Sequence, residues 1–246
     1  DIDGSESSPT GDNLRIIAQF GDIVPGGDGR FSSPLVRAIN DAGQVAFTSS
    51  LFGNSGGFDE NFGVFVGDGF RTEEIFRQGD SVPEGNGQFA GNVFGVHMAA
   101  GGQVAFSTFL VNTGETFELG NGIEIEGIGL FIGDGEEVIT VARLGEELLG
   151  STISSLSFVS ENDLGGRTLI NDSGQVAFGA ELADGSSGAF LFTPELNYRA
   201  GRDGFWDNAN NWTLGLLPSA VHDVAINSDS SATVFGPADN TTVRSL

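Results

Sequence analysis

Short apolar runs separated by glycine- and aspartate-rich turns alternate along most of the chain. Three of these runs follow almost the same turn and read INDAGQVAF, AAGGQVAF and INDSGQVAF, at residues 39–47, 99–106 and 170–178. Glycine adopts positive φ without steric cost, and Asn and Asp tolerate it, so these residues favour tight turns. Val-Ala-Phe is typical of a β-strand. The pattern therefore predicts a tight turn followed by a strand at three places.

The repeated unit is longer than this signature. A second apolar run follows each signature and reads GVFVGDG, GLFIGDG and GAFLF, at residues 63–69, 129–135 and 188–192. An apolar run and a Gly-Asp-x-x-Pro turn precede the first two signatures, in RIIAQFGDIVPGGDGRF and EIFRQGDSVPEGNGQF, and ITVARLGEELLGSTISSLSF is a third copy without the proline. The repeat predicts three units, at about residues 14–69, 70–135 and 136–196.

These units predict an all-β fold. Each unit contains three or four expected strands and no persuasive helix, so we expect three tandem antiparallel β-sheets. A single small sheet cannot bury its own apolar face and must stack on its neighbour, in a propeller-like or a prism-like arrangement. Six phenylalanines recur at equivalent positions and form the predicted core: Phe47, Phe106, Phe178, Phe65, Phe131 and Phe190. Residues 1–13 are expected to be a flexible acidic N-terminus.

The signature resembles a known tandem repeat. Residues 40–47 and 171–178 fit the pattern Asn-x-x-Gly-x-x-Ala-Phe, whereas the middle copy has Ala99 where Asn is expected. Over about residues 14–196 the chain is therefore similar to the NxxGxxAF tandem-repeat family of secreted and surface-anchored bacterial proteins. The resemblance implies secretion and a β-repeat, and it brings no catalytic residues with it.

Residues 197–246 lack the repeat and are predicted to be a β-strand-rich C-terminal segment. They contain both tryptophans, Trp206 and Trp212, and the runs DVAIN, ATVF and TTVRSL. Trp-x5-Trp followed by Gly-x-x-Pro and Asp-Val-x-Ile resembles the first rung of the β-solenoid passenger domains of exported bacterial proteins. This resemblance implies either a second domain or a strand-rich tail on the first. The tryptophans are interpreted either as core anchors or as a ligand or assembly site, for example stacked on a sugar.

The charged residues are few and strongly acidic. The chain of 246 residues has 34 Asp and Glu against 10 Lys and Arg, a net charge of −24, and no Cys. Such a surface repels nucleic acid and anionic membranes, and the lack of Cys excludes disulfides and thiolate sites. No apolar run approaches the roughly 20 residues of a membrane span, and Asp1 begins the sequence without a signal pattern. We expect a mature secreted chain, extracellular or at the cell surface.

Calcium is the metal that this composition favours. Its ligands are hard oxygens, and carboxylates stand on several glycine-rich loops. The main candidates are Asp28, Asp68 and Asp134, joined by Asp41 and Asp172 of the signature turns, and all are also explained as turn residues. The histidines, His97 and His222, lie in different regions of the chain, and neither has metal-ligand spacing to a partner. No catalytic residue and no other cofactor is predicted.

Two classes of function follow from these observations. The first is a structural subunit of an extracellular filament, surface layer or matrix, which self-associates into a homopolymer through β-strand or tail contacts. The second is a monomeric adhesion or carbohydrate-binding module that binds glycans through its loop face or through the region of Trp206 and Trp212. A hydrolase is a third and weaker hypothesis, because nothing in the sequence pairs any two carboxylates specifically.

Overall fold

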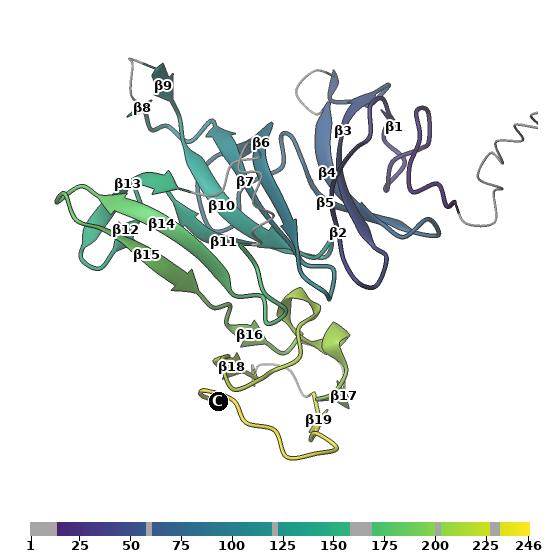
Figure 1. The fold of residues 1–246 in the computed structure, drawn as a ribbon, viewed down its shortest axis with the longest axis vertical. Helices are drawn as coiled ribbons and strands as arrows, with labels where there is room; N and C mark the ends of the chain where they lie inside the picture. The colour runs from purple at the N-terminus through teal and green to yellow at the C-terminus, as the bar shows by residue number, and fades with distance from the viewer. Residues whose placement is uncertain (1–13, 58–60, 120–122, 158–168, 200–202, 227–231) are drawn as a thin grey trace, which may run out of the picture.

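Three antiparallel β-sheets follow one another along the chain in the computed structural model (Figure 1). The structure describes residues 14–57, 61–119, 123–157, 169–199, 203–226 and 232–246. Nearly all of the regular structure in these ranges is β, and the helices with described bounds are two 3₁₀ turns, η3 (Ala209–Asn211) and η4 (Thr213–Gly215). The predicted all-β class with three tandem antiparallel sheets is therefore confirmed.

The three sheets have related strand orders. Sheet 1 has the order β1-β3-β4-β5, with β2 also paired to β3, and consists of β1 (Arg30–Phe31), β2 (Leu35–Ile39), β3 (Val45–Phe52), β4 (Phe62–Gly67) and β5 (Thr72–Arg77). Sheet 2 has the order β6-β7-β10-β11 and consists of β6 (Gln88–Met98), β7 (Val104–Val111), β10 (Ile128–Gly133) and β11 (Val138–Arg143), with a side hairpin of β8 (Phe117–Leu119) and β9 (Ile123–Ile125). Sheet 3 has the order β12-β13-β14-β15 and consists of β12 (Glu147–Leu148), β13 (Ser151–Ser157), β14 (Val176–Leu182) and β15 (Ser187–Phe192).

Sheets 1 and 2 each end one strand later than the sequence repeat indicates. Strand β5 pairs antiparallel with β4, and β11 pairs with β10. The expected unit boundaries at 69/70 and 135/136 therefore fall inside a sheet, before its last strand. The second and third sequence units each give their first strand to the sheet before them, so backbone hydrogen bonds join successive units.

The repeated phenylalanines lie at equivalent core positions, as predicted. They face one another in pairs across adjacent strands: Phe47 and Phe65, Phe106 and Phe131, and Phe178 and Phe190. The paired rings stack with centroid distances of 5.5, 5.6 and 5.6 Å respectively. All six are buried except Phe190, which is partly buried against the same core. A third ring, Phe31 in sheet 1 and Phe89 in sheet 2, packs edge-to-face on its pair.

Each of the first two sheets packs a face of small and aliphatic side chains, the forward face, against the phenylalanines of the next sheet. The forward face consists of Ala46, Val64 and Val66 in sheet 1 and of Ala105, Leu130 and Ile132 in sheet 2. The first set shares a buried cluster with Phe106 of sheet 2, and the second set shares one with Phe178 of sheet 3. Phe76 at the end of sheet 1 stacks on Phe106 with 4.5 Å between ring centroids. The core therefore lies between the sheets.

The three signature turns also contact one another. Asn40 Nδ2 donates a hydrogen bond to the carbonyl oxygen of Ala100 at 3.0 Å. The backbone N–H of Ala100 in turn donates to the carboxylate of Asp172 at 3.0 Å. These bonds join one end of the three sheets into a continuous row, and they give Asp172 a structural role.

The C-terminal segment packs on sheets 2 and 3 and extends their core. Trp212, Leu214 and Val224 belong to the buried cluster that contains Ala105 and Phe178. Two arrangements were expected for this segment, a second domain or a tail on the first domain, and the structure shows a tail that packs on the sheets. Its strands pair in parallel, β16 (Leu196–Asn197) with β18 (Val224–Ala225) and β17 (Gly204–Phe205) with β19 (Val234–Phe235). The likeness to a β-solenoid rung stays a prediction.

Phe106→Ala tests the packing between sheets 1 and 2. Phe106 is fully buried between the rings of Phe76 and Phe131, so its truncation is expected to lower the free energy of unfolding by about 3–5 kcal/mol. The matched control is Phe70→Ala, because Phe70 is exposed and its ring lies under the Arg15 guanidinium. Loss of this contact is expected to cost less than about 1 kcal/mol. Urea unfolding measures both variants, and equal losses would contradict the assigned core.

Candidate functional site

The free edge of sheet 3 distinguishes it from the other two sheets. Strand β15 pairs with β14 in the same way that β4 pairs with β3 and β10 with β7. On their other side β4 and β10 each hold a last strand, β5 or β11, whereas no strand of the described ranges pairs with that side of β15. An edge of this kind presents unpaired backbone N–H and C=O groups, which can pair with another strand.

The forward face of sheet 3 is uncovered as well. Ala177 lies opposite Leu191 in this sheet, just as Ala46 lies opposite Val66 in sheet 1. Ala46 and Val66 are buried, whereas Ala177 is exposed and Leu191 is 62% exposed. Ala189, on the same face as Leu191, is also exposed. Sheet 3 thus presents to solvent the kind of face that sheets 1 and 2 bury against their neighbours.

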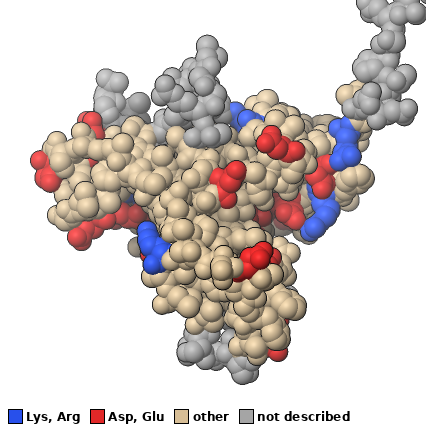
Figure 2. Space-filling model, turned by 60° about the horizontal axis from the view of Figure 1, so that its bottom comes forward, with Lys and Arg blue, Asp and Glu red and all other residues tan. Residues whose placement is uncertain are grey.

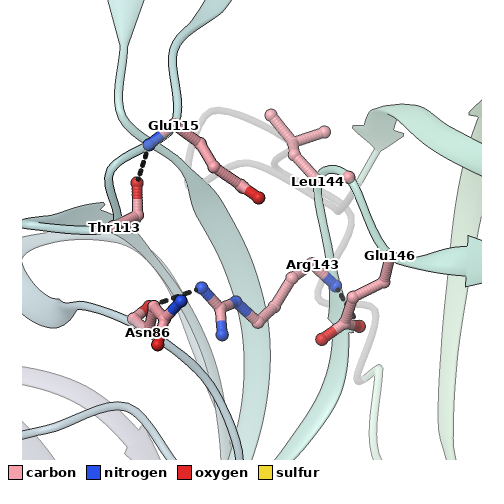
Figure 3. Close-up of a pocket in the computed structure, with 7 residues that line it drawn as sticks. Asn86, Thr113, Glu115, Arg143, Leu144 and Glu146 are labelled. Atoms are coloured by element: carbon pink, nitrogen blue, oxygen red, sulfur yellow. Dashed lines mark hydrogen bonds between the residues drawn. The ribbon is translucent and has the colours of Figure 1, made fainter.

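A polar pocket lies beside Arg143, at the junction of sheets 2 and 3 (Figure 3). The Arg143 guanidinium donates to the carbonyl oxygen of Asn86 at 2.8 Å, and its backbone N–H donates to the Glu146 carboxylate at 3.0 Å. Burial raises the pKa of Glu146, and the nearby Arg143 opposes that shift. Glu115 lines the opposite wall, where its N–H donates to the Thr113 hydroxyl. These bonds hold the glycine-rich loop that contains Asn86 against the turn at residues 143–146.

Arg77 occupies the equivalent place at the junction of sheets 1 and 2. Its guanidinium donates to the carbonyl oxygen of Asp28 at 2.9 Å and pairs with Glu74 at 2.9 Å, and its backbone N–H donates to Asp80 at 2.7 Å. The pattern Arg-x-Gly-Asp/Glu, at 77–80 and 143–146, is visible in the sequence. Its repetition indicates a structural link rather than a binding site, because both arginines are buried against backbone carbonyls.

Two of the calcium candidates, Asp28 and Asp68, cap separate turns. Asp28 accepts from the backbone N–H and the hydroxyl of Ser55, both at 2.8 Å, and Asp68 accepts from the N–H groups of Phe70 and Arg71 at 2.7 and 2.8 Å. These hydrogen bonds lower the pKa of both carboxyls. Among the residues that the structure describes, no three His, Asp or Glu side chains are grouped to hold a metal ion. Calcium binding therefore stays a prediction.

The third candidate, Asp134, is paired with an arginine of the C-terminal segment. Arg199 Nη2 lies 3.0 Å from Asp134 and 2.8 Å from Glu137, and Nη1 pairs with Glu136. Glu137 also accepts from the backbone N–H of Leu214 at 2.8 Å. The cation at this acidic turn is thus a guanidinium. No local sequence pattern indicates this cluster, because Arg199 is separated from Asp134 by 65 positions along the chain.

The two tryptophans form a core pair. Trp212 is fully buried, its ring lies edge-on to Trp206 with 4.8 Å between centroids, and its Nε1–H donates to the Trp206 carbonyl oxygen at 2.8 Å. Tyr198 packs against the other side of Trp212 at 5.2 Å. Of the two interpretations of the tryptophans, the position of Trp212 supports that of a core anchor, since its side chain is fully buried; a ligand or assembly role stays a prediction. Trp206 is partly exposed.

His222 ties the C-terminal segment to the third signature turn. The ring is buried, Nδ1 accepts from the backbone N–H of Ser219 at 3.1 Å, and Nε2 lies 2.8 Å from the carbonyl oxygen of Ser173. Because Nδ1 accepts, Nε2 carries the proton and donates to that carbonyl. The Ser219 hydroxyl is 3.0 Å from Nδ1, but the ring faces a carbonyl rather than a carboxylate on its other side. This arrangement holds a turn and does not form a catalytic triad.

Charge on the visible surface is dispersed. Figure 2 shows acidic side chains on several separate parts of one face, and the basic side chains on that face lie beside some of them. In the described part of the chain, no helix has the length and apolar character needed to cross a bilayer. Neither observation indicates a second candidate site. The candidate assembly surface is therefore the free edge of sheet 3.

The geometry defines a tandem β-sheet repeat protein with an uncovered last sheet. A family model described as a family of unknown function, DUF7453, matches residues 5–196. The chain belongs to this family, whose match includes all three sheets and ends where the C-terminal segment begins. No curated protein and no solved structure matches the chain.

The histidine contact predicts that mild acid weakens the fold. Burial lowers the pKa of His222, the hydrogen bond with the Ser173 carbonyl opposes this shift, and Arg244 adds to it. Burial also lowers the pKa of His97. A depressed histidine pKa means that the unfolded chain binds more protons, so stability is complete above about pH 6.5 and declines below it. Each histidine contributes a slope of at most about 1.4 kcal/mol per pH unit.

Urea unfolding at pH 7.5 and pH 5.5 measures this effect. Three buried carboxyls have the opposite effect on the free energy of unfolding. Burial raises the pKa of Asp80, Glu137 and Glu146, so the folded chain binds more protons at these groups and acidification stabilises it there. His222→Gln is expected to reduce the loss between the two pH values, and His97→Gln reports the other histidine separately. An unchanged loss in both variants would show that neither imidazole is its source.

Proposed function

We propose that this protein is a secreted bacterial structural protein whose subunits self-associate, through β-strand contacts, into an extracellular filament, surface layer or matrix. The observation that carries the proposal is the open end of the repeat: sheet 3 exposes both its strand edge and its forward face. Two internal interfaces bury the same kind of face. A surface built to pack against a sheet, and left without one, is suited to a partner with the same architecture.

Composition supports an extracellular setting. The chain has no Cys and a net charge of −24, and its fold depends on phenylalanine stacking and glycine turns rather than on disulfides. Strong negative charge keeps free subunits soluble and is screened at the ionic strength of most external media. The resemblance of the signature to secreted and surface-anchored repeat proteins points the same way. Export itself is part of the proposal.

Other functions have less support from the site. Glycan binding through the tryptophan pair would need an open ring face, which buried Trp212 lacks. The polar pocket at Arg143 holds side chains that already bind each other and the backbone. The free edge of sheet 3 supports a function better than either of these features. The chain fills the equivalent edge of sheets 1 and 2 with a strand, β5 or β11.

Leu191→Asp tests the proposal. A leucine that passes from 62% exposed to buried contributes about 1 to 2 kcal/mol to association, part of the roughly 1.5–3 kcal/mol of full burial, and an aspartate there would add the cost of burying a charge. The variant is expected to remain folded, because the position is exposed in the single subunit, and to weaken self-association at least about tenfold. Sedimentation velocity and negative-stain electron microscopy measure the loss of assemblies.

Leu149→Asp is the matched control. Leu149 is an equally apolar residue that is 83% exposed in a turn at positive φ, a conformation that aspartate tolerates. This variant is expected to assemble like the unmodified chain. A monomeric unmodified chain at all concentrations would refute the proposal, as would assemblies that Leu191→Asp leaves intact.

A further inference from the structure

One segment of the chain has the features of a sheet strand but no sheet. Residues 14–19, with the sequence LRIIAQ, precede the turn at 19–22 as β5 precedes the turn at 77–80. The backbone N–H of Gln19 donates to the Asp22 carboxylate at 3.0 Å, and that of Arg77 donates to Asp80 at 2.7 Å. Within the described ranges, residues 14–19 join no strand ladder. They are the equivalent of β5 and β11 for a sheet that would precede sheet 1.

This segment already lies where the last strand of a preceding sheet would lie. A Cβ placed on Gly67 of sheet 1 would be 2.9 Å from Cγ2 of Ile17, and one placed on Gly133 of sheet 2 would be 2.9 Å from Cγ2 of Ile75. The two glycines therefore accommodate the same isoleucine contact from the strand before them. Ile17 and Ala18 also pack on the phenylalanine cluster of sheet 1. The segment therefore lies on sheet 1 in the way that Ile75 and Phe76 of β5 lie on sheet 2.

Sheet 1 exposes the other half of an inter-sheet contact. Val96 and Met98 of sheet 2 lie opposite Phe106 and Val104, and both are only 7% exposed because sheet 1 covers them. The equivalent residues of sheet 1 are Val36 and Ile39, opposite Phe47 and Val45, and they are 67% and 69% exposed.

The two uncovered surfaces are complementary. Within the described ranges, sheet 3 has no strand on the outer side of β15 and an exposed forward face. Sheet 1 has the additional segment 14–19 and an exposed part of its phenylalanine face. Each internal interface joins these same two surfaces.

We propose that residues 14–19 of one subunit form the missing last strand of sheet 3 in a second copy of this chain. The inference rests on the proposed self-assembly and names its contact. The register follows from β5 on β4, where Gly63 lies opposite Arg77 and Val64 opposite Phe76, and from β11 on β10. It places Gln19 opposite Gly188 and Ala18 opposite Ala189.

The rest of the contact follows from the same comparison. After the bulge that β4–β5 shows between its second and third pairs, Ile16 lies opposite Phe190 and Arg15 opposite Leu191. Leu191, Ala189 and Ala177 of the second copy then cover Val36 and Ile39 of the subunit that supplies residues 14–19. The contact is head-to-tail, so repetition gives an open filament or a closed ring according to the rotation at each step.

A second copy is the occupant that the fold favours over closure within one chain. Sheet 2 lies between sheets 1 and 3, and it shares one buried cluster with each of them (Figure 1). Residues 14–19 pack on the side of sheet 1 that faces away from sheet 2. Pairing them with β15 of the same chain would require removal of sheet 1 from sheet 2, whereas pairing with a second copy leaves every internal contact in place.

Single-cysteine variants test this pairing without interference, because the chain has no Cys of its own. Ala18→Cys and Ala189→Cys are purified separately, mixed under assembly conditions and oxidised. Residues directly opposite across antiparallel strands have Cα atoms about 4.5–5.5 Å apart, within the range of a disulfide. The mixture is expected to give a mixed disulfide dimer at least tenfold in excess of either variant alone. Leu14→Cys with Ala189→Cys is the control, because four residues of strand shift the cysteine by about 13 Å.

The outcomes separate this inference from the proposed function. Sedimentation of the unmodified chain under the same conditions reports assembly independently of the cross-link. Assembly with a selective Ala18–Ala189 disulfide supports the strand contact. Assembly without it, or with an equal yield for the Leu14 control, overturns the strand contact and leaves the proposed self-association standing. If a variant with both Ala18→Cys and Ala189→Cys forms the disulfide only within single chains, the second copy is not the occupant of this edge. If the unmodified chain does not assemble, both proposals are overturned.

Discussion

The packing of small side chains against phenylalanine rings is the interaction on which the rest of this structure depends. Ala46 and Ala105 are fully buried, each one residue before a phenylalanine that points to the opposite face of its strand. An alanine leaves room for the rings of the following sheet, whereas the phenylalanine fills the space left by the preceding one. Interiors pack at crystal-like density, so the two surfaces must match in volume. The dipeptide Ala-Phe therefore encodes a sheet with two different faces.

A sheet with two different faces gives direction to a stack in which unlike faces meet. Its forward face fits the phenylalanine face of a neighbour, and stacking proceeds in one direction only. The backbone adds a second constraint in the same direction, because the second and third units give their first strands, β5 and β11, to the preceding sheet. Side-chain packing and strand exchange thus have the same polarity, and a finite number of units leaves one unmatched surface at each end. The open ends of this protein follow from the repeat itself.

Local rules were sufficient to predict the parts of this fold that depend on local sequence. The signature turns, the strands at Val45 and Val104 and the core phenylalanines follow from turn chemistry and alternation, and all are present in the structure. The assignment of β5 to the sheet before it could not be predicted, because a repeat has no intrinsic starting point and its pattern does not say which neighbour a strand joins. The Arg199 cluster and the exposure of Leu191 depend on contacts between distant segments, which no local pattern reports.

The C-terminal segment stiffens the sheet stack without covering its open end. It contacts sheets 2 and 3 at the end where the signature turns lie, through Gln103 Nε2 donating to the Leu214 carbonyl at 2.8 Å and through His222 at Ser173. Arg199 adds ion pairs to the turn that ends β10. These contacts lie away from Leu191, which stays exposed on β15. A tail in this position fixes the angle between two successive sheets, and a fixed angle is what allows a repeated head-to-tail contact to build a regular assembly rather than an irregular aggregate.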